Sequence, residues 1–249
     1  MSDLIVLFVA GFLGGMLNTV AGGGTFITFP ALVFTGLPEL MANASSTVAG
    51  LPGYLAGAVG FRREILRLDR ALLLRLTGLT MLGGAVGSGL LLISSNAAFT
   101  VLVPFLLLAA TGVFLWGDKL RARASQWRRG VQAFGAGTLM PMAIYGGYFN
   151  GGLGIVLLAL FALWGRTDLH EMNGLKTWLS FALSVISCVI FSIGGLVAWG
   201  PALVMMLGTV SGGYLGAPLA RRIPRPVLRG LIALVGLGMT AVFFQRLFL

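Results

Sequence analysis

The chain has 249 residues, of which 57% are hydrophobic and only 10% are charged, and its mean hydropathy is +0.97. Soluble domains carry about a quarter charged residues, so this composition excludes a soluble globular protein and predicts a protein solvated by lipid. The formal net charge is +10, but the basic residues lie in short loops between apolar spans, which indicates membrane orientation rather than nucleic-acid binding.

Eight apolar runs follow one another along the chain. They are Leu4–Thr35, Met41–Gly60, Leu72–Ile93, Ala97–Trp116, Val131–Trp164, Gly174–Val197, Ala202–Ala220 and Leu231–Phe248. A membrane-spanning helix needs about 20 residues, which suits six of these runs. The first and the fifth runs are too long for one spanning helix and poorly suited to form two. Glycines interrupt them at Gly22–Gly24 and Gly151–Gly154.

Three connections are rich in basic residues, at 62–75, 117–130 and 221–229. Their basic residues are Arg62, Arg63, Arg67, Arg70, Arg75, Lys119, Arg121, Arg123, Arg128, Arg129, Arg221, Arg222, Arg225 and Arg229. Basic loops face the cytoplasm, so we expect these connections inside and the uncharged ones at Ser94–Asn96 and Ala198–Pro201 outside. With the loops placed in this way, Val131–Trp164 begins and ends on the cytoplasmic side, so it must be a hairpin. If the two halves of the chain have the same architecture, Leu4–Thr35 is a hairpin as well.

An internal repeat supports two such hairpins. At an offset of 130 residues the sequence aligns Gly22 with Gly152, Gly24 with Gly154, Asn43 with Asn173 and Thr47 with Thr177. Each half is then one hairpin plus three spans, so the number of crossings is odd and the halves must be inverted. The glycine-rich stretches GGAVGSG at Gly83 and SGGYLG at Ser211 are assigned to close helix packing.

We therefore predict an all-α polytopic membrane protein of about 8–10 membrane segments, built from two inverted repeats with a broken, re-entrant helical hairpin in each. The first repeat is expected at 1–117, a cytoplasmic basic linker at 118–130 and the second repeat at 131–249.

The two broken stretches predict an anion site. After the first glycines, TFITFPALVFTG supplies only 12 residues, or about 18 Å of helix, which is too short to cross the membrane. A helix that restarts inside the bilayer presents free N–H groups and a partial positive charge. The second hairpin repeats this arrangement at Tyr148–Gly154. Two such tips entering from opposite faces would meet near the midplane; close packing of glycines is the alternative interpretation.

Polar residues beside each hairpin follow helical spacing. Asn43, Ser46, Thr47 and Gly50 lie at i, i+3, i+4 and i+7, and Asn173, Lys176, Thr177 and Ser180 repeat the pattern. Such a stripe should face the hairpins or a wet cavity, or provide hydrogen bonds between helices. Lys176 lies about one turn into its span, so both anion binding and extension to the cytoplasmic interface remain open.

No pattern in the sequence indicates catalysis. His170 has no partner at metal-ligand spacing, Cys188 is isolated, and Gly22–Gly24 lacks the Lys and Ser/Thr of a phosphate-binding loop. No pairing of a nucleophile with a base stands out. We therefore expect no enzyme activity, no catalytic residue, no metal, no cofactor and no nucleic-acid partner.

Three stretches resemble a known family. NTVAGGGTFITFPALVFTGLPELMANASSTVA resembles the first repeat signature of the sulfite exporter TauE/SafE family, YGGYFNGGLGIVLLALFALWGRTDLHEMNGLKTWLS its second repeat signature, and SGGYLGAPLARRIP its later glycine-basic element. The resemblance implies a bacterial inner-membrane transporter for small sulfur-containing or related organic anions, such as sulfite, sulfoacetate or other sulfonates. Asn150 stands where many relatives have a small residue, so the specificity of one member does not transfer to this chain.

Residues and resemblance together indicate a secondary transporter that works by alternating access. An anion channel with the same tips and a structural subunit with packing glycines are the alternatives. The expected partners are a small anionic substrate and the lipid bilayer, and the coupling ion, proton or sodium, and the oligomeric state stay open. The predicted substrate-binding residues are Asn18, Gly22, Gly23, Gly24, Thr25, Asn43, Ser46, Thr47, Asn150, Gly151, Gly152, Gly154, Asn173, Lys176 and Thr177.

Overall fold

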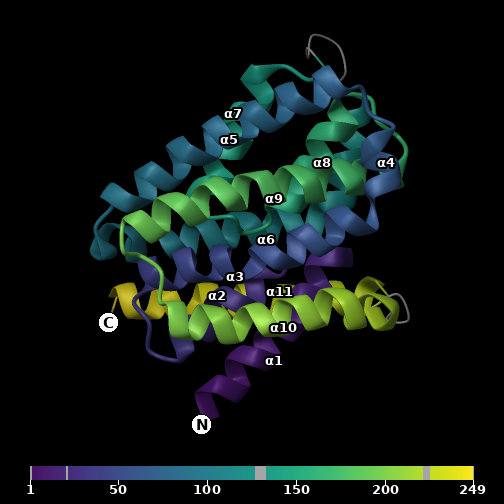
Figure 1. Cartoon of the computed structure of the whole chain (residues 1–249). Coiled ribbons are helices and arrows are strands. Elements are labelled where there is room, and N and C mark those ends of the chain that lie inside the picture. The colour runs from purple at the N-terminus through teal and green to yellow at the C-terminus, as the bar shows by residue number, and fades with distance from the viewer. Residues whose placement is uncertain (1, 21, 127–132, 221–224, 249) are drawn as a thin grey trace.

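The computed structural model describes residues 2–20, 22–126, 133–220 and 225–248, which are largely helical (Figure 1). The first half contains α1 (Ser2–Val20), α2 (Thr25–Phe34), α3 (Glu39–Gly60), α4 (Arg62–Leu66), α5 (Arg70–Ile93) and α6 (Asn96–Gln126). The second half contains α7 (Ala136–Tyr148), α8 (Leu153–Leu163), α9 (Leu169–Ile193), α10 (Trp199–Ala220) and α11 (Arg225–Phe248). The predicted all-α class is therefore confirmed. Of the basic residues considered above, Arg128, Arg129, Arg221 and Arg222 lie outside the described residues, as do the side chains of Arg121, Arg225 and Arg229.

Several helices are suited to a bilayer. The segments long and apolar enough to cross a membrane within the described ranges are Ser2–Thr19, Arg70–Ile93, Asn96–Gly117 and Leu169–Ile193. Many large apolar side chains, such as Leu82, Phe105 and Leu207, face outward, as expected where lipid replaces water as the solvent. By contrast α2 and α8 have only 10 and 11 residues. The chain is thus a multi-pass membrane protein in which α2 and α8 are too short to cross the bilayer.

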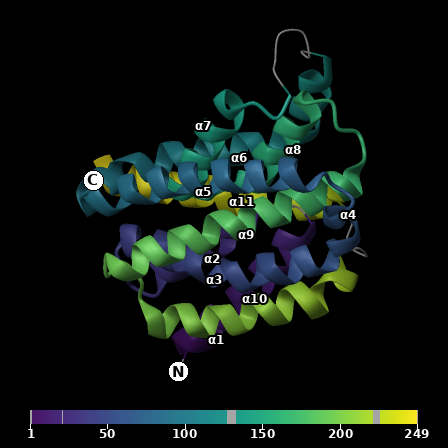
Figure 2. The same ribbon diagram turned by 45° about the horizontal axis from the view of Figure 1, so that its top comes forward.

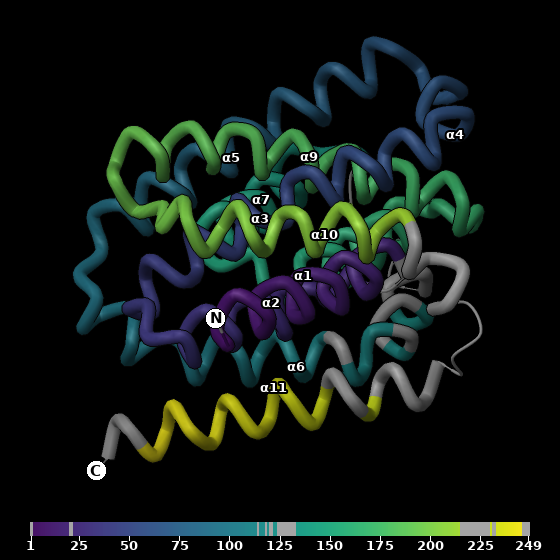
Figure 3. The backbone as a smooth tube through the Cα atoms, turned by 60° about the horizontal axis from the view of Figure 1, so that its bottom comes forward, coloured from purple at the N-terminus to yellow at the C-terminus, as the bar shows by residue number. Residues whose placement is uncertain are grey.

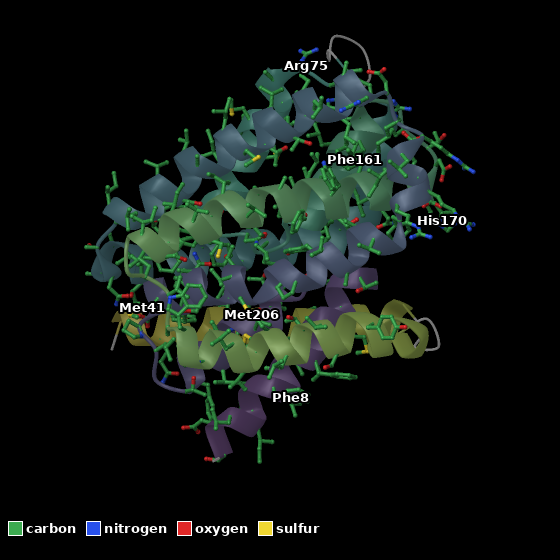
Figure 4. All side chains as sticks on the ribbon, in the orientation of Figure 1. Phe8, Met41, Arg75, Phe161, His170 and Met206 are labelled. Carbon is green, nitrogen blue, oxygen red and sulfur yellow. The ribbon has the colours of Figure 1, made fainter. Side chains whose placement is uncertain are left out.

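The two ends of the bundle differ in charge. The uncharged connections 35–38, 94–95 and 194–198 gather at one end, toward the left of Figure 1. There the backbone N–H of Leu40 donates to the Asn96 side chain across 3.1 Å. Figure 4 places Met41 near this end and Arg75 and His170 far from it. This separation is the charge asymmetry on which the orientation of membrane proteins depends.

Two predicted loops are partly helical, because aspartate side chains cap the following helices. Asp69 accepts a hydrogen bond from the N–H of Leu72 across 2.8 Å, so α5 already begins at Arg70. Asp168 accepts one from the N–H of His170 across 2.8 Å, so α9 begins at Leu169. The expected start of that span at Gly174 was therefore wrong by more than one turn, and Lys176 lies about two turns into the helix.

Glycine-lined faces allow close helix packing. Helix α1 packs against α10, and α5 packs against α7. A Cβ built on Gly87 would overlap the Ile144 carbonyl oxygen of α7, and one built on Gly212 would overlap the Phe12 carbonyl oxygen of α1. Packing is therefore confirmed as a role of these two glycine-rich stretches.

The helices with the polar stripes lie in the centre of the molecule. Helix α3 packs against both α9 and α10, as Figure 2 shows, and α9 also packs against α5. Helix α11 lies beside α6 (Figure 3), while α8 packs on α6 and α2 packs on α11. The two short helices are thus enclosed by spanning helices instead of lying on the surface.

We expect Gly87→Ala to destabilise the protein, because the new methyl group forces α5 away from α7. Overpacking of this kind costs about 1–3 kcal/mol, and the thermal unfolding midpoint of the purified protein in detergent measures it. Gly89→Ala is the matched control, since nothing lies within 4 Å of its added Cβ, and alanine should leave stability unchanged or raise it slightly. Equal midpoints for the two variants would contradict the packing role of Gly87.

Candidate functional site

The first tip joins α1 to α2. Gly22 has a φ of +76°, in the left-handed region that glycine adopts without strain, and its N–H donates to the Leu17 carbonyl oxygen across 3.0 Å. The Asn18 side-chain oxygen accepts a hydrogen bond from the N–H of Gly24 across 2.8 Å. Asn18 therefore closes the turn from which α2 restarts at Thr25.

The second tip joins α7 to α8 in a similar way. Gly152 has a φ of +71°, and Asn150 is also left-handed, with a φ of +53°. The Tyr145 hydroxyl donates to the Gly151 carbonyl oxygen. The ring of Phe149 packs edge-on against that of Phe29 in α2, with 6.0 Å between centroids. Aromatic packing thus fixes the second tip against the first hairpin.

The two tips contact each other through backbone atoms. A Cβ built on Gly22 would lie 3.1 Å from the Cα of Gly154, and one built on Gly154 would lie 3.0 Å from the Cα of Gly22 and 3.2 Å from the Cδ of Lys176. The prediction that the hairpin tips meet is therefore confirmed. Side chains larger than hydrogen would separate the tips.

Several backbone N–H groups at this contact have no acceptor. The turn hydrogen bonds use the N–H groups of Gly22, Gly24 and Gly151, and those of Leu153 and Ile155. Within the described ranges, no hydrogen bond uses the N–H groups of Gly23, Thr25, Gly152 or Gly154. Free N–H groups at the start of a helix attract anions. The tips thus bring two such helix starts together.

Lys176 is buried beside the tips. Its side chain is 1% exposed, and its ammonium group donates to the Asn173 side-chain oxygen across 2.9 Å. It is the only buried charged side chain in the described part of the chain. The one ion pair found among the described residues joins Arg166 and Glu171 across 3.0 Å, so no described carboxylate neutralises Lys176. Its side chain does not extend to the protein surface.

The polar stripe of α3 contacts both hairpins. The Asn43 side-chain nitrogen donates to the carbonyl oxygen of Tyr148, the last residue of α7, across 2.8 Å. The Ser46 and Thr28 hydroxyls are 2.6 Å apart and hydrogen-bonded. The Thr47 hydroxyl donates back to the Asn43 carbonyl oxygen across 3.0 Å. Asn43 therefore points at the second tip, while the hydroxyls of Ser46 and Thr47 are already paired inside the protein.

The stripe of α9 differs from that of α3. The Thr177 hydroxyl donates to the carbonyl oxygen of Asn173 across 2.9 Å, and its methyl group faces Gly57 of α3. Asn173 is only half-buried, and its side-chain nitrogen donates to the Leu169 carbonyl oxygen across 2.8 Å. Thr177 is thus a packing residue between α3 and α9, and Asn173 contacts the site through Lys176.

Tyr54 also belongs to this cluster, although the sequence interpretation did not select it. Its side chain is 7% exposed, and a Cβ built on Gly50 would lie 3.4 Å from its ring and 4.0 Å from the Asn18 side-chain nitrogen of the first tip. Tyr54 lies four residues after Gly50 and so continues the stripe of α3 by one more turn. The four-residue step from Gly50 to Tyr54 is the sequence feature that could have identified Tyr54 as part of the site.

The site is enclosed by protein. Apart from half-buried Asn173, every residue predicted to bind substrate is buried. In the residues that the structure describes, no group of three or more His, Cys, Asp or Glu side chains could bind a metal.

These features define a class, namely a multi-pass helical membrane protein in which two interrupted helices meet beside a buried lysine. The family model described as Sulfite exporter TauE/SafE matches residues 7–243. The chain therefore belongs to the TauE/SafE sulfite exporter family.

Curated relatives extend over nearly the whole chain. A "Probable membrane transporter protein" from Haemophilus influenzae is 30% identical over 96% of this chain and 93% of its own length. "Probable membrane transporter protein ORF9" from a Sinorhizobium species is 26% identical, over 95% of this chain and 90% of its own. "Probable membrane transporter protein YfcA" from Escherichia coli K12 is 25% identical, over 95% and 87%. No solved structure matches the chain.

We expect Gly22→Ala to disrupt the site beyond its effect on the backbone. A left-handed alanine costs about 1–2 kcal/mol, and Gly36→Ala, where φ is +91°, introduces similar strain with nothing within 4 Å of its Cβ. Both variants should lose comparable thermal stability. Only Gly22→Ala should also abolish substrate flux in proteoliposomes, because its methyl group separates the tips. Equal flux in the two variants would contradict a functional role for the tip contact.

Proposed function

We propose that the chain is a secondary transporter that moves a small anion, such as sulfite, sulfoacetate or another sulfonate, across the bacterial inner membrane. Family membership and the relatives' names support membrane transport. The anionic substrate and the mechanism are our proposal. The observation that carries it is the buried ammonium group of Lys176 beside tips with unpaired N–H groups.

An anion would offset an unfavourable arrangement. An isolated charge inside a protein loses several kcal/mol of hydration, and a partner charge normally compensates for the loss. The described residues provide Lys176 with only the neutral oxygen of Asn173. An oxyanion between Lys176 and the tips would neutralise the ammonium group and accept hydrogen bonds from the N–H groups of Gly152 and Gly154.

Alternating access follows from two inverted halves, which we place at 1–117 and 131–249, joined by the basic linker at 118–130. The halves correspond when α1 is matched with α7, α3 with α9, α10 with α5, α6 with α11 and α8 with α2. Contacts in the structure then occur in equivalent pairs: α1–α10 and α7–α5, α3–α10 and α9–α5, and α6–α8 and α11–α2. The positive φ values of Gly36 and Gly165, both +91°, fall at equivalent helix ends. Inverted repeats with broken helices are a recurring design of secondary transporters.

The enclosed site corresponds to an occluded state. We place the three basic connections on the cytoplasmic side, so that half-buried Asn173 lies between that side and Lys176. Opening toward either side requires the halves to rock about the contact between Gly22 and Gly154. The contact itself is backbone on backbone, and beside it the Asn43 side chain joins the halves by donating a hydrogen bond to the Tyr148 carbonyl oxygen.

We expect Lys176→Met to remove anion binding while preserving the fold. Methionine resembles the lysine stem in size and removes the unpaired charge, so the thermal unfolding midpoint should stay unchanged or rise. Sulfite should no longer raise that midpoint, and sulfite flux in proteoliposomes should fall at least tenfold. Lys119→Met, at an exposed position in α6, is the matched control and should behave as wild type. Normal sulfite flux through Lys176→Met would contradict the proposed site.

Counterflow distinguishes a carrier from an anion channel. Proteoliposomes loaded with unlabelled sulfite and diluted into labelled sulfite should transiently accumulate the label above equilibrium. A carrier that exports unlabelled sulfite returns to the inner side with labelled sulfite bound, so the outward flow drives the label inward. A channel dissipates the gradient without such an overshoot. The absence of an overshoot in vesicles that conduct sulfite would contradict alternating access.

A further inference from the structure

Two amide oxygens at the second tip have no hydrogen-bond partner. Asn43 and Asn150 are 1% and 3% exposed, and the side-chain oxygen of each is buried and unpaired. Both lie at the turn that follows α7, since Asn43 contacts the carbonyl of Tyr148 and Asn150 is two residues further along. A buried acceptor without a donor is unfavourable, so such groups in native proteins normally face water or a ligand.

The orientation of the Asn43 amide is fixed by its nitrogen. This nitrogen donates to the Tyr148 carbonyl oxygen, which can only accept, so the Asn43 oxygen points elsewhere. The Asn150 side-chain oxygen is likewise buried without a hydrogen-bond partner. Both oxygens can therefore accept a hydrogen bond from a ligand at the second tip.

The ligand that suits these oxygens carries a hydrogen-bond donor. A metal cation is disfavoured, because hard cations are bound through several oxygens and the neighbouring ammonium group of Lys176 would repel it. A second anionic group is disfavoured as well, since two acceptors would face it. A neutral hydroxyl group matches the acceptors and leaves the charge balance between Lys176 and one anionic group intact.

We propose that the transported substrate is a small hydroxylated monoanion, whose anionic end binds Lys176 and the tips while its hydroxyl group donates to Asn43 and Asn150. This inference rests on the proposed anion transport and narrows its substrate class. A hydroxyalkyl sulfonate can occupy both the anion site and these acceptors, whereas inorganic sulfite occupies the anion site alone.

Isothermal titration of the full chain in detergent tests the inference with three ligands of similar size. We expect 2-hydroxyethanesulfonate to bind about tenfold more tightly than ethanesulfonate, because only the former satisfies the buried oxygens. Sulfoacetate, with a carboxylate in place of the hydroxyl group, should bind more weakly than 2-hydroxyethanesulfonate. If both simple sulfonates bind equally, the hydroxyl site is wrong and anion transport still stands. If none of the three binds, both proposals are wrong.

Two variants test whether Asn43 and Asn150 produce the preference for 2-hydroxyethanesulfonate over ethanesulfonate. Asn150→Gly keeps the left-handed backbone at no steric cost, and Asn43→Leu removes the other oxygen at similar volume. Each should reduce the tenfold preference, taken as the ratio of the two affinities within the same variant, to about twofold or less. Thr111→Val is the matched control, because it also removes a buried unpaired oxygen, but beside Gly236 of α11. It should keep the full preference. An undiminished preference in both asparagine variants would overturn the assignment.

Discussion

A backbone N–H group without an acceptor is costly inside a membrane, where no water replaces the missing bond. This chain leaves such groups at two interrupted helices and places both against each other in the centre of the protein. The remaining helices create that enclosure. Glycine faces bring α1 to α10 and α5 to α7, and α3 and α9 cover the tips with polar side chains. The interior is therefore polar at one point and apolar around it.

The two halves supply similar scaffolds but different chemistry. In the first half Ser46 pairs with Thr28 within the protein and needs no ligand. At the equivalent place in the second half, the Lys176 ammonium group donates to the neutral side-chain oxygen of Asn173, and no described carboxylate pairs with it. This single charge between otherwise similar helices is why we propose one bound anion, held in one orientation between the halves.

The broken helices could be predicted from the sequence because the length of the apolar runs and the loop charges leave few topologies. The stripe of Asn43 and its neighbours followed from helical spacing alone. Tyr54 continues the same spacing by one turn, but a tyrosine in an apolar run is equally suited to lipid or core, so spacing alone did not single it out. The depth of Lys176 was underestimated because the Asp168 cap starts α9 earlier than hydrophobicity indicates. The pairing of Ser46 with Thr28 depends on the fold of the hairpin, which no local pattern reveals.

The proposed anion site lies where the two tips meet Lys176. Selenite has the shape and charge of sulfite and scatters X-rays anomalously, so crystals grown with selenite locate the anion directly. We expect one strong selenium peak within hydrogen-bonding distance of the Lys176 ammonium group and of an N–H group from each tip, among Gly23, Thr25, Gly152 and Gly154. A selenium peak only elsewhere, with Lys176 still contacting Asn173 alone at saturating selenite, would contradict it.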